Sequence, residues 1–95
     1  AQARALRVLQ RRGLRVPVST VLNLQPTYPA SDDPRDIALA KEMDGYFNRW
    51  FLEPMYLGRY PTELNRRFKL DRLPRGEIEE MRIGGELNSL GINYY

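Results

Sequence analysis

The feature that most constrains the fold is a pair of strand-like segments separated by a long stretch of helical sequence. The first, Val18–Leu24, is rich in β-branched and aliphatic residues and is bounded by Pro17 and Pro26. Its nearly continuous apolar content predicts a strand buried on both faces. The second is Leu87–Tyr95, with apolar and aromatic residues toward its end. Because a crossover this long can return the chain in the same direction, we expect the two strands to be parallel neighbours.

One long helix is predicted between these strands, over Pro34–Leu52. Asp33 is a typical N-cap residue, and proline suits the first helical position. Pro54 is expected to end the helix, because proline disfavours helical geometry at the residue before it. Apolar residues recur at threes and fours along the segment, which indicates one broad apolar face. They are Ile37, Ala40, Met43, Phe47, Trp50 and Phe51.

Shorter helices are predicted on both sides of the long one. Residues 1–12 place apolar side chains at helical spacing among arginines, and Gly13 is a natural stop. Short helices are also expected from Pro61 toward Phe68 and over Gly76–Ile83. The order helix, strand, long helix, short helices, strand is typical of an α/β protein. We therefore treat residues 1–95 as a single α/β segment with two parallel strands.

Composition excludes several kinds of chemistry. The 95 residues contain no cysteine and no histidine, so the sequence offers no thiolate nucleophile, no Ser-His-Asp triad and none of the usual zinc ligands. We expect no metal and no cofactor. The catalytic groups that remain are carboxylates, tyrosine, lysine and arginine.

The net charge of +3 comes from the N-terminal segment alone. From Asp32 onward the sequence has ten basic and twelve acidic residues, a net negative balance that disfavours binding to a nucleic-acid backbone. The arginine-rich helix is therefore interpreted as a solvated face. No apolar run approaches the roughly 20 residues of a membrane span, so we expect a soluble cytoplasmic protein without a membrane partner.

Four short motifs carry a resemblance to a known family. They are Leu22–Ser31, Asn48–Pro54, Gly58–Pro61 and Gly91–Tyr95. In this order and spacing they resemble glycoside hydrolase family 1, the retaining β-glucosidases and their relatives, which are built on a (β/α)8 barrel. The resemblance covers the whole sequence and implies a partial barrel, from about the fourth barrel helix to the sixth barrel strand. Residues 1–95 would then be a segment of a glycosidase barrel and not a complete domain.

The resemblance also implies which catalytic groups this sequence lacks. A retaining glycosidase uses two carboxyl groups about 5 Å apart, one as acid/base and one as nucleophile. In the family they lie in an Asn-Glu-Pro motif on the fourth strand and a Glu-Asn-Gly motif on the seventh, and neither tripeptide occurs here. Glu53 precedes a proline but follows Trp50 and Phe51, which matches a different segment of the family. We therefore assign no catalytic residue to this chain and expect it to be inactive alone.

Two groups of substrate-binding residues follow from the same resemblance. Tyr95 matches the tyrosine whose hydroxyl donates to the nucleophilic carboxylate, and such a donor favours the ionised form. Asn93 matches a polar group that lines the same pocket. After the first strand, Asn23, Gln25 and Tyr28 would lie near the mouth that accepts the leaving-group part of a β-glycoside substrate.

An alternative is that the chain is an engineered, reconstructed or excised barrel fragment without catalysis. Asn88 and Ser89 stand where the family usually has Asp-Phe, and Gln2 stands where a histidine is common. Open strand edges would then pair with the remaining barrel strands or with a second copy of the chain, giving a folding or self-assembly role. A ligand-binding role for the clustered aromatic residues is a variant, in which a haem iron could be held only by tyrosine or methionine.

Overall fold

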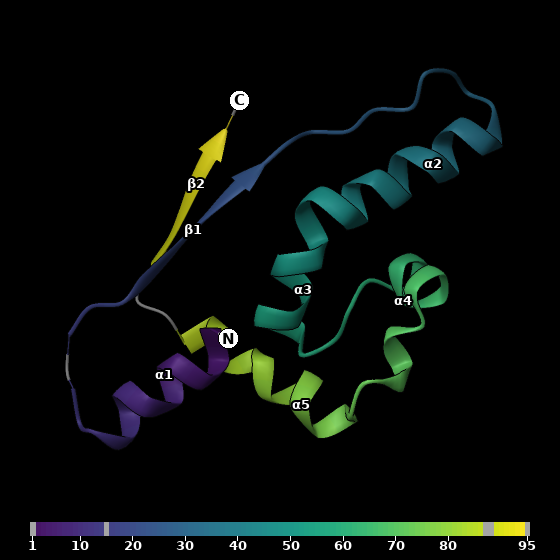
Figure 1. Ribbon diagram of the computed structural model, residues 1–95. Helices are drawn as coiled ribbons and strands as arrows, with labels where there is room; N and C mark the ends of the chain where they lie inside the picture. The colour runs from purple at the N-terminus through teal and green to yellow at the C-terminus, as the bar shows by residue number, and fades with distance from the viewer. Residues whose placement is uncertain (1, 15, 87–88, 95) are drawn as a thin grey trace.

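The computed structural model describes residues 2–14, 16–86 and 89–94 of the chain. Within them, β1 (Ser19–Leu24) and β2 (Ser89–Tyr94) lie side by side and run in the same direction (Figure 1). The register pairs Asn23 with Asn93 at the carboxyl ends of the two strands. The predicted parallel pair is thus confirmed, while residues 87, 88 and 95 of the predicted second strand lie outside the described residues.

Helical elements precede β1 and fill the connection from β1 to β2, in the predicted order. They are α1 (Gln2–Arg11), α2 (Pro34–Asp44), a π-type turn (Gly45–Arg49), α3 (Trp50–Leu57), α4 (Thr62–Phe68), a 3-10 turn (Leu70–Arg72), α5 (Arg75–Glu80) and a 3-10 segment (Met81–Glu86).

The predicted end of the long helix was wrong. Helical geometry continues through Pro54, which lies buried inside α3, and ends only at Gly58, where φ is 65°. The Gly58 amide donates to the Pro54 carbonyl at 3.2 Å, which is how a left-handed residue closes a helix. Tertiary packing explains why proline is tolerated: Met55 beside it is buried as α3 packs on the 3-10 segment Met81–Glu86.

The predicted helix is also not uniform. The π-type turn Gly45–Arg49 separates α2 from α3, and the two helices run in different directions in Figure 1. Wider turns of this kind are one of the recognised causes of helix kinks. The single predicted rod is therefore two helices joined by a bend.

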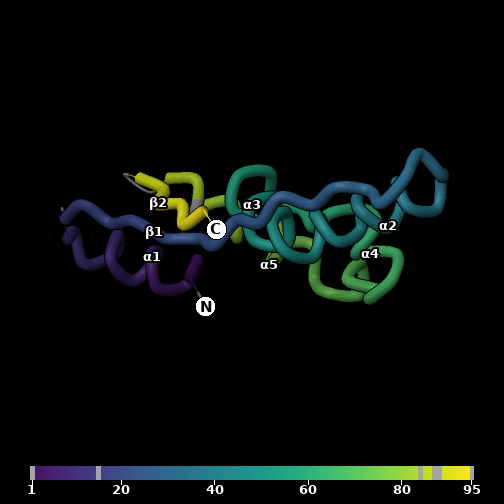
Figure 2. Tube along the Cα trace, turned by 90° about the horizontal axis from the view of Figure 1, so that it is seen from above, coloured from purple at the N-terminus to yellow at the C-terminus, as the bar shows by residue number. Residues whose placement is uncertain are grey.

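Burial of β1 on both faces was a wrong prediction. Along β1 exposure alternates, and Val21 on the exposed face is 59% accessible, whereas Leu22 is half-buried and lines a shallow cavity with Trp50 and Phe51 of α3. Within the described residues, helices pack against the side of β1 that carries Leu22 and leave the Val21 side open. On the Leu22 side of β2, Ile92 and Tyr94 are 54% and 74% exposed. Figure 2 shows the resulting flat shape, whose extents are 52 × 33 × 15 Å.

The hydrophobic core is small for a chain of this length. Among the described residues the hydrophobic side chains that are buried are Met55, Leu64 and Ile83. The radius of gyration is 15.5 Å, whereas a compact domain of this length would have about 12 Å. Trp50 adds edge contacts between α3 and α4, because its ring centroid lies 5.5 Å from that of Phe68. The helical layer is therefore held together chiefly around α3, which packs on the segment Met81–Glu86.

The arginine face of α1 meets the acidic face of α5. Arg7 pairs with Glu80 at 3.3 Å and Arg4 with Glu77 at 3.8 Å. All four side chains are well exposed, so these pairs contribute little to stability. They do offset part of the local positive charge, as expected of a solvated helix face.

A pair of glycine substitutions tests the observed end of α3. Gly58→Ala should lower the free energy of unfolding by about 1–2 kcal/mol, since a Cβ disfavours left-handed backbone. Gly76→Ala lies inside α5, and its new Cβ would meet no other part of the described structure within 4 Å. This substitution should raise the free energy of unfolding by about 0.5–1 kcal/mol. Urea unfolding followed by fluorescence of Trp50, the single tryptophan, measures both. Equal changes of the same sign in the free energy of unfolding would contradict a left-handed Gly58 at the end of α3.

Candidate functional site

The carboxyl ends of β1 and β2 bring two of the predicted site residues together. The Asn93 side-chain nitrogen donates to the Asn23 side-chain oxygen at 2.9 Å, although the two residues are 70 positions apart. On the same face, at the other end of the strands, the hydroxyl groups of Ser19 and Ser89 are also hydrogen-bonded. Both asparagines are exposed. Carboxamides carry donors and acceptors, so this end of the face can bind hydroxyl groups.

The middle of this open face is narrow and apolar. Gly91 lies opposite Val21 in the register. A Cβ added at Gly91 would lie 3.0 Å from the Val21 Cγ2 atom, so a larger residue there would displace the valine. The face is thus polar at both ends and tightly packed between them.

The segment after β1 is held by a residue to which the sequence had assigned no role. The Gln25 amide donates to Asn48 Oδ1 at 2.9 Å, and Asn48 Nδ2 donates to the Gln25 carbonyl at 2.8 Å. Asn48 is buried, with 9% of its surface exposed. Two features of the sequence could have indicated a role for Asn48. It is an asparagine within a predicted apolar helical face, and it belongs to one of the family-like motifs. The Gln25 backbone is therefore positioned, while the residue itself is exposed.

Arg49 is the centre of a charge network beside Asn48. Its guanidinium donates to Asp44, Glu63 and Glu53, the last at 3.0 Å, and to the Lys41 carbonyl at 2.9 Å. Asp44 also accepts from Asn48 Nδ2 at 2.7 Å. The network links α2, the π-type turn, α3 and α4.

Ionisation in this network is maintained by opposing effects. Burial raises the pKa of Asp44, but hydrogen bonds from Asn48 and Arg49 and the charge of Arg49 bring that pKa below its ordinary value. Glu63 follows the same pattern, with its pKa lowered mainly by Arg49 against the effect of burial. For Arg49, burial lowers the pKa, but the hydrogen bonds to Glu63 and Asp44 outweigh that effect. The pKa of Arg49 is therefore raised above its ordinary value. All of these groups are charged at neutral pH.

Glu53 is a member of this network and not a strand-end carboxylate. Its oxygens lie 3.0 Å from Arg49 and 3.7 Å from Arg59, and its side chain is 16% exposed within α3. Both carboxylate oxygens are thus engaged by arginines inside the helical layer, away from the strand-end face. The structure is thus consistent with leaving Glu53 out of the catalytic assignment.

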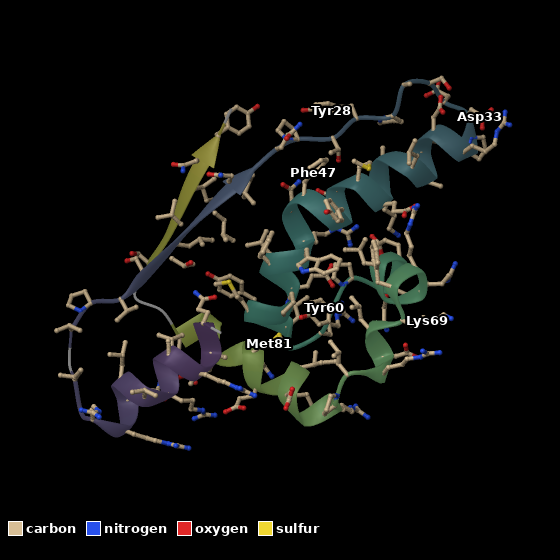
Figure 3. All side chains as sticks on the ribbon, viewed as in Figure 1. Tyr28, Asp33, Phe47, Tyr60, Lys69 and Met81 are labelled. Atoms are coloured by element: carbon tan, nitrogen blue, oxygen red, sulfur yellow. The ribbon has the colours of Figure 1, made fainter. Side chains whose placement is uncertain are left out.

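Of the two predicted site tyrosines, Tyr28 and Tyr95, the structure describes Tyr28. Tyr28 is 81% exposed and lies on the segment between β1 and α2 (Figure 3). It lines a cavity of about 260 Å³ together with Phe47 and residues of α2. Tyr95 lies outside the described residues. The roles assigned to both tyrosines remain predictions.

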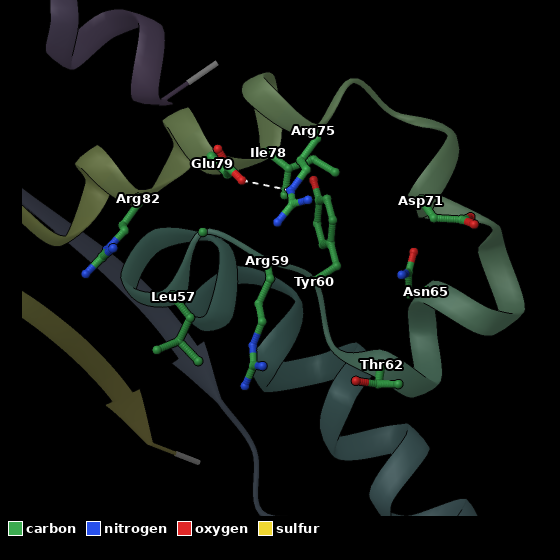
Figure 4. A pocket seen from close by; sticks show the side chains of 11 residues that line it. Leu57, Arg59, Tyr60, Thr62, Asn65, Asp71, Arg75, Ile78, Glu79 and Arg82 are labelled. Atoms are coloured by element: carbon green, nitrogen blue, oxygen red, sulfur yellow. Dashed lines mark hydrogen bonds and ion pairs between the residues drawn. The ribbon is translucent and has the colours of Figure 1, made fainter.

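A larger cavity, of about 590 Å³, lies among α3, α4 and α5 and contains none of the predicted site residues (Figure 4). Arg59, Arg75 and Arg82 border it, and Arg75 pairs with Glu79 at 2.9 Å. The strand-end face is open on one side, so its polar groups do not enclose a cavity of their own. We assign the site by its chemistry and position rather than by enclosed volume.

Two further observations concern residues 2–14, 16–86 and 89–94. Within these ranges, acidic side chains form no group of three or more that could hold a metal ion. None of the helices described there combines the length and apolar character needed to cross a membrane.

Comparison with known proteins places this geometry in a family. The family model described as glycosyl hydrolase family 1 matches residues 1–95. The chain belongs to glycosyl hydrolase family 1. Relatives include a 6-phospho-beta-glucosidase of Bacillus subtilis, 33% identical over the full length of this chain, and beta-glucosidase A of Enterobacter agglomerans, 41% identical over 90% of it. The chain spans 21% and 17% of the lengths of these two proteins.

Solved structures of family 1 enzymes match the whole architecture. A beta-glucosidase from Exiguobacterium antarcticum superposes with a TM-score of 0.82 at 29% identity, covering 98% of this chain and 22% of the enzyme. A family 1 glycoside hydrolase of Thermotoga maritima, complexed with a cyclophellitol analogue as a transition-state mimic, gives 0.76 at 31%, covering 99% and 21%. The predicted α/β part of a (β/α)8 barrel is thus confirmed.

Removing the central cation of the network tests its contribution. Arg49→Met would remove the ion pairs of Asp44 and Glu63 and leave Glu53 with Arg59 alone, so we expect a loss of about 2–4 kcal/mol in the free energy of unfolding at pH 7. The matched control is Arg75→Met. Arg75 is 92% exposed in its pair with Glu79, so its removal should cost under about 1 kcal/mol.

The pH dependence follows from the lowered pKa values of Asp44 and Glu63. A carboxylate whose folded pKa is depressed adds stability above its unfolded pKa, about 4, and loses it as pH falls through the folded value. Chemical unfolding measured from pH 7 to pH 2.5 should show this acid loss, and Arg49→Met should flatten it. An unchanged slope in the variant would contradict the network.

Proposed function

We propose that the chain is the central segment of a retaining β-glycosidase that hydrolyses β-glucosides or close relatives. The observation that carries this proposal is the polar, uncovered strand-end face where Asn93 donates to Asn23. Active sites of (β/α)8 barrels are built at the carboxyl ends of their strands. The match to family 1 over residues 1–95 supports the same role.

The chemistry requires carboxylates that this segment does not supply. β1 and β2 carry no aspartate or glutamate, and Glu53 is committed to Arg49 and Arg59. Since retaining hydrolysis uses an acid/base and a nucleophile about 5 Å apart, both must come from other strands of the barrel. We therefore propose that residues 1–95 are one segment of a domain and are inactive alone. The mechanism requires no metal and no cofactor.

Each predicted site residue has a proposed role at this strand end. Tyr95 would donate to the nucleophilic carboxylate and favour its ionised form. Asn93 and Asn23 would bind substrate hydroxyl groups, and Gln25 with Tyr28 would face the leaving group. The exposed side of the strand pair, including Val21 at 59%, would lie inside the closed barrel. The remaining barrel strands are the proposed partners, and we propose a cytoplasmic location and a role in carbohydrate metabolism.

An activity comparison tests the proposal. The purified 95-residue chain should release no 4-nitrophenol from 4-nitrophenyl β-glucoside, because both catalytic carboxyl groups are missing. The same sequence within a complete barrel should hydrolyse the substrate with retention of the anomeric configuration, read by proton NMR. Turnover by the short chain that survives replacement of each of its carboxylates would contradict the assignment. Concentration-dependent self-association without activity in either form would favour the non-catalytic alternative.

The proposed role of Tyr95 gives a sharper prediction. In the complete barrel, Tyr95→Phe should lower kcat/KM by about 10- to 100-fold, which corresponds to one hydrogen bond to a charged group. The acidic limb of the pH profile should move to higher pH, because loss of the donor raises the pKa of the nucleophile. Tyr94→Phe is the control. Tyr94 is 74% exposed on β2 and lies on the side of the strand opposite to Asn93, so activity should change less than about twofold.

A further inference from the structure

The chain leaving β1 is fixed to the helical layer at two points. Asn48 makes hydrogen bonds to both main-chain polar groups of Gln25, at 2.9 and 2.8 Å. Two residues later the Thr27 hydroxyl donates to the Ala40 carbonyl at 3.2 Å. Pro26 lies between them, and proline limits its own φ and the backbone of the residue before it. The backbone from Gln25 to Thr27 is therefore restricted throughout.

The orientation of the Asn48 carboxamide is set by its neighbour. Asp44 is ionised and can only accept hydrogen bonds, so it requires the nitrogen end of the carboxamide, 2.7 Å from its Oδ1. This leaves Asn48 Oδ1 for the Gln25 amide. Asp44 in turn is held by Arg49. One chain of contacts thus runs from the charge network to the strand end.

The π-type turn makes this chain of contacts possible. Asn48 and Arg49 follow Asp44 by four and five positions, and both contact its carboxylate. A π-type turn places the residue five positions ahead over the starting one, so one carboxylate reaches two successive side chains. Such turns inside helices are frequent at functional sites.

Burial shows that Asn48 is unusual for its position. Among the described residues it is the polar one that is buried, at 9% exposed, and a buried carboxamide is costly unless its groups are paired. Its bonds reach Gln25 and Asp44. Its principal effect outside its own helix is on the backbone of Gln25.

We propose that Asn48 is a positioning residue for substrate binding. By holding the Gln25 backbone it places the Gln25 and Tyr28 side chains on the leaving-group side of the site, without touching the substrate itself. This inference rests on the proposed glycosidase function. It adds a helical residue to a site otherwise assigned to strands and the segment that follows β1.

Kinetics of Asn48→Ala in the complete barrel protein test the proposal. We expect KM for 4-nitrophenyl β-glucoside to rise about 5- to 10-fold with kcat within twofold, since the leaving group loses a placed contact surface. The inhibition constant of glucose, which has no leaving group, should change less than twofold. Asn48→Asp keeps the side-chain volume but loses the donor to Gln25, and it should show the same split. Asn65→Ala, at the cavity among α3, α4 and α5, is the control and should leave both constants unchanged.

Amide hydrogen exchange in the same protein gives a readout independent of activity. Exchange at the Gln25 amide should accelerate about tenfold or more in Asn48→Ala, which removes its acceptor, and should stay unchanged in Asn65→Ala. The proposal would be overturned if Asn48→Ala lowered thermal stability but left Gln25 exchange unchanged and left the ratio of KM to the glucose inhibition constant unchanged. Absence of β-glucoside hydrolysis by the unmodified protein would instead overturn the proposed function, and the exchange data would still decide whether Asn48 holds the strand end.

Discussion

Parallel pairing of β1 with β2 is the constraint on which the other features depend. Parallel neighbours require a long connection, and here that connection contains α2 through α5. The pairing also aligns the two carboxyl ends, so that Asn23 and Asn93 meet without any direct sequence proximity. A two-stranded sheet with helices on one side leaves its other face open. Fold and candidate site are therefore consequences of the same pairing.

The helical layer is connected to the strand end through charge rather than through a large core. Arg49 joins α2, α3 and α4 by contacts with Asp44, Glu53 and Glu63. Asn48 extends that network to the Gln25 backbone. With few buried apolar side chains in the described residues, such polar contacts account for much of the local order. They engage the carboxylates of Asp44, Glu53 and Glu63 within the helical layer.

Local sequence rules predicted the elements well and their limits less well. Asp33 does cap α2, since its side chain accepts from the Arg35 amide, and the strand composition located both strands. The rule that proline ends a helix failed at Pro54, because burial against the segment carrying Ile83 outweighed one lost hydrogen bond. The prediction that β1 is buried on both faces was wrong. Apolar composition shows that a strand is suited to burial on both sides, but the described residues cover only one side of β1.

The element types, the parallel pairing and the family were predictable from the amino-acid sequence, because they depend on apolar periodicity, connection length and ordered motifs. It also excluded thiol and imidazole chemistry, since cysteine and histidine are absent. The contacts of Asn48 with Gln25 and of Glu53 with Arg49 became evident from the three-dimensional structure. The Asn48 contact joins residues 23 positions apart, and Asn48 lies on a π-type turn that no local pattern predicted. Side-chain geometry across such a bend is set by packing, which one-dimensional patterns do not contain.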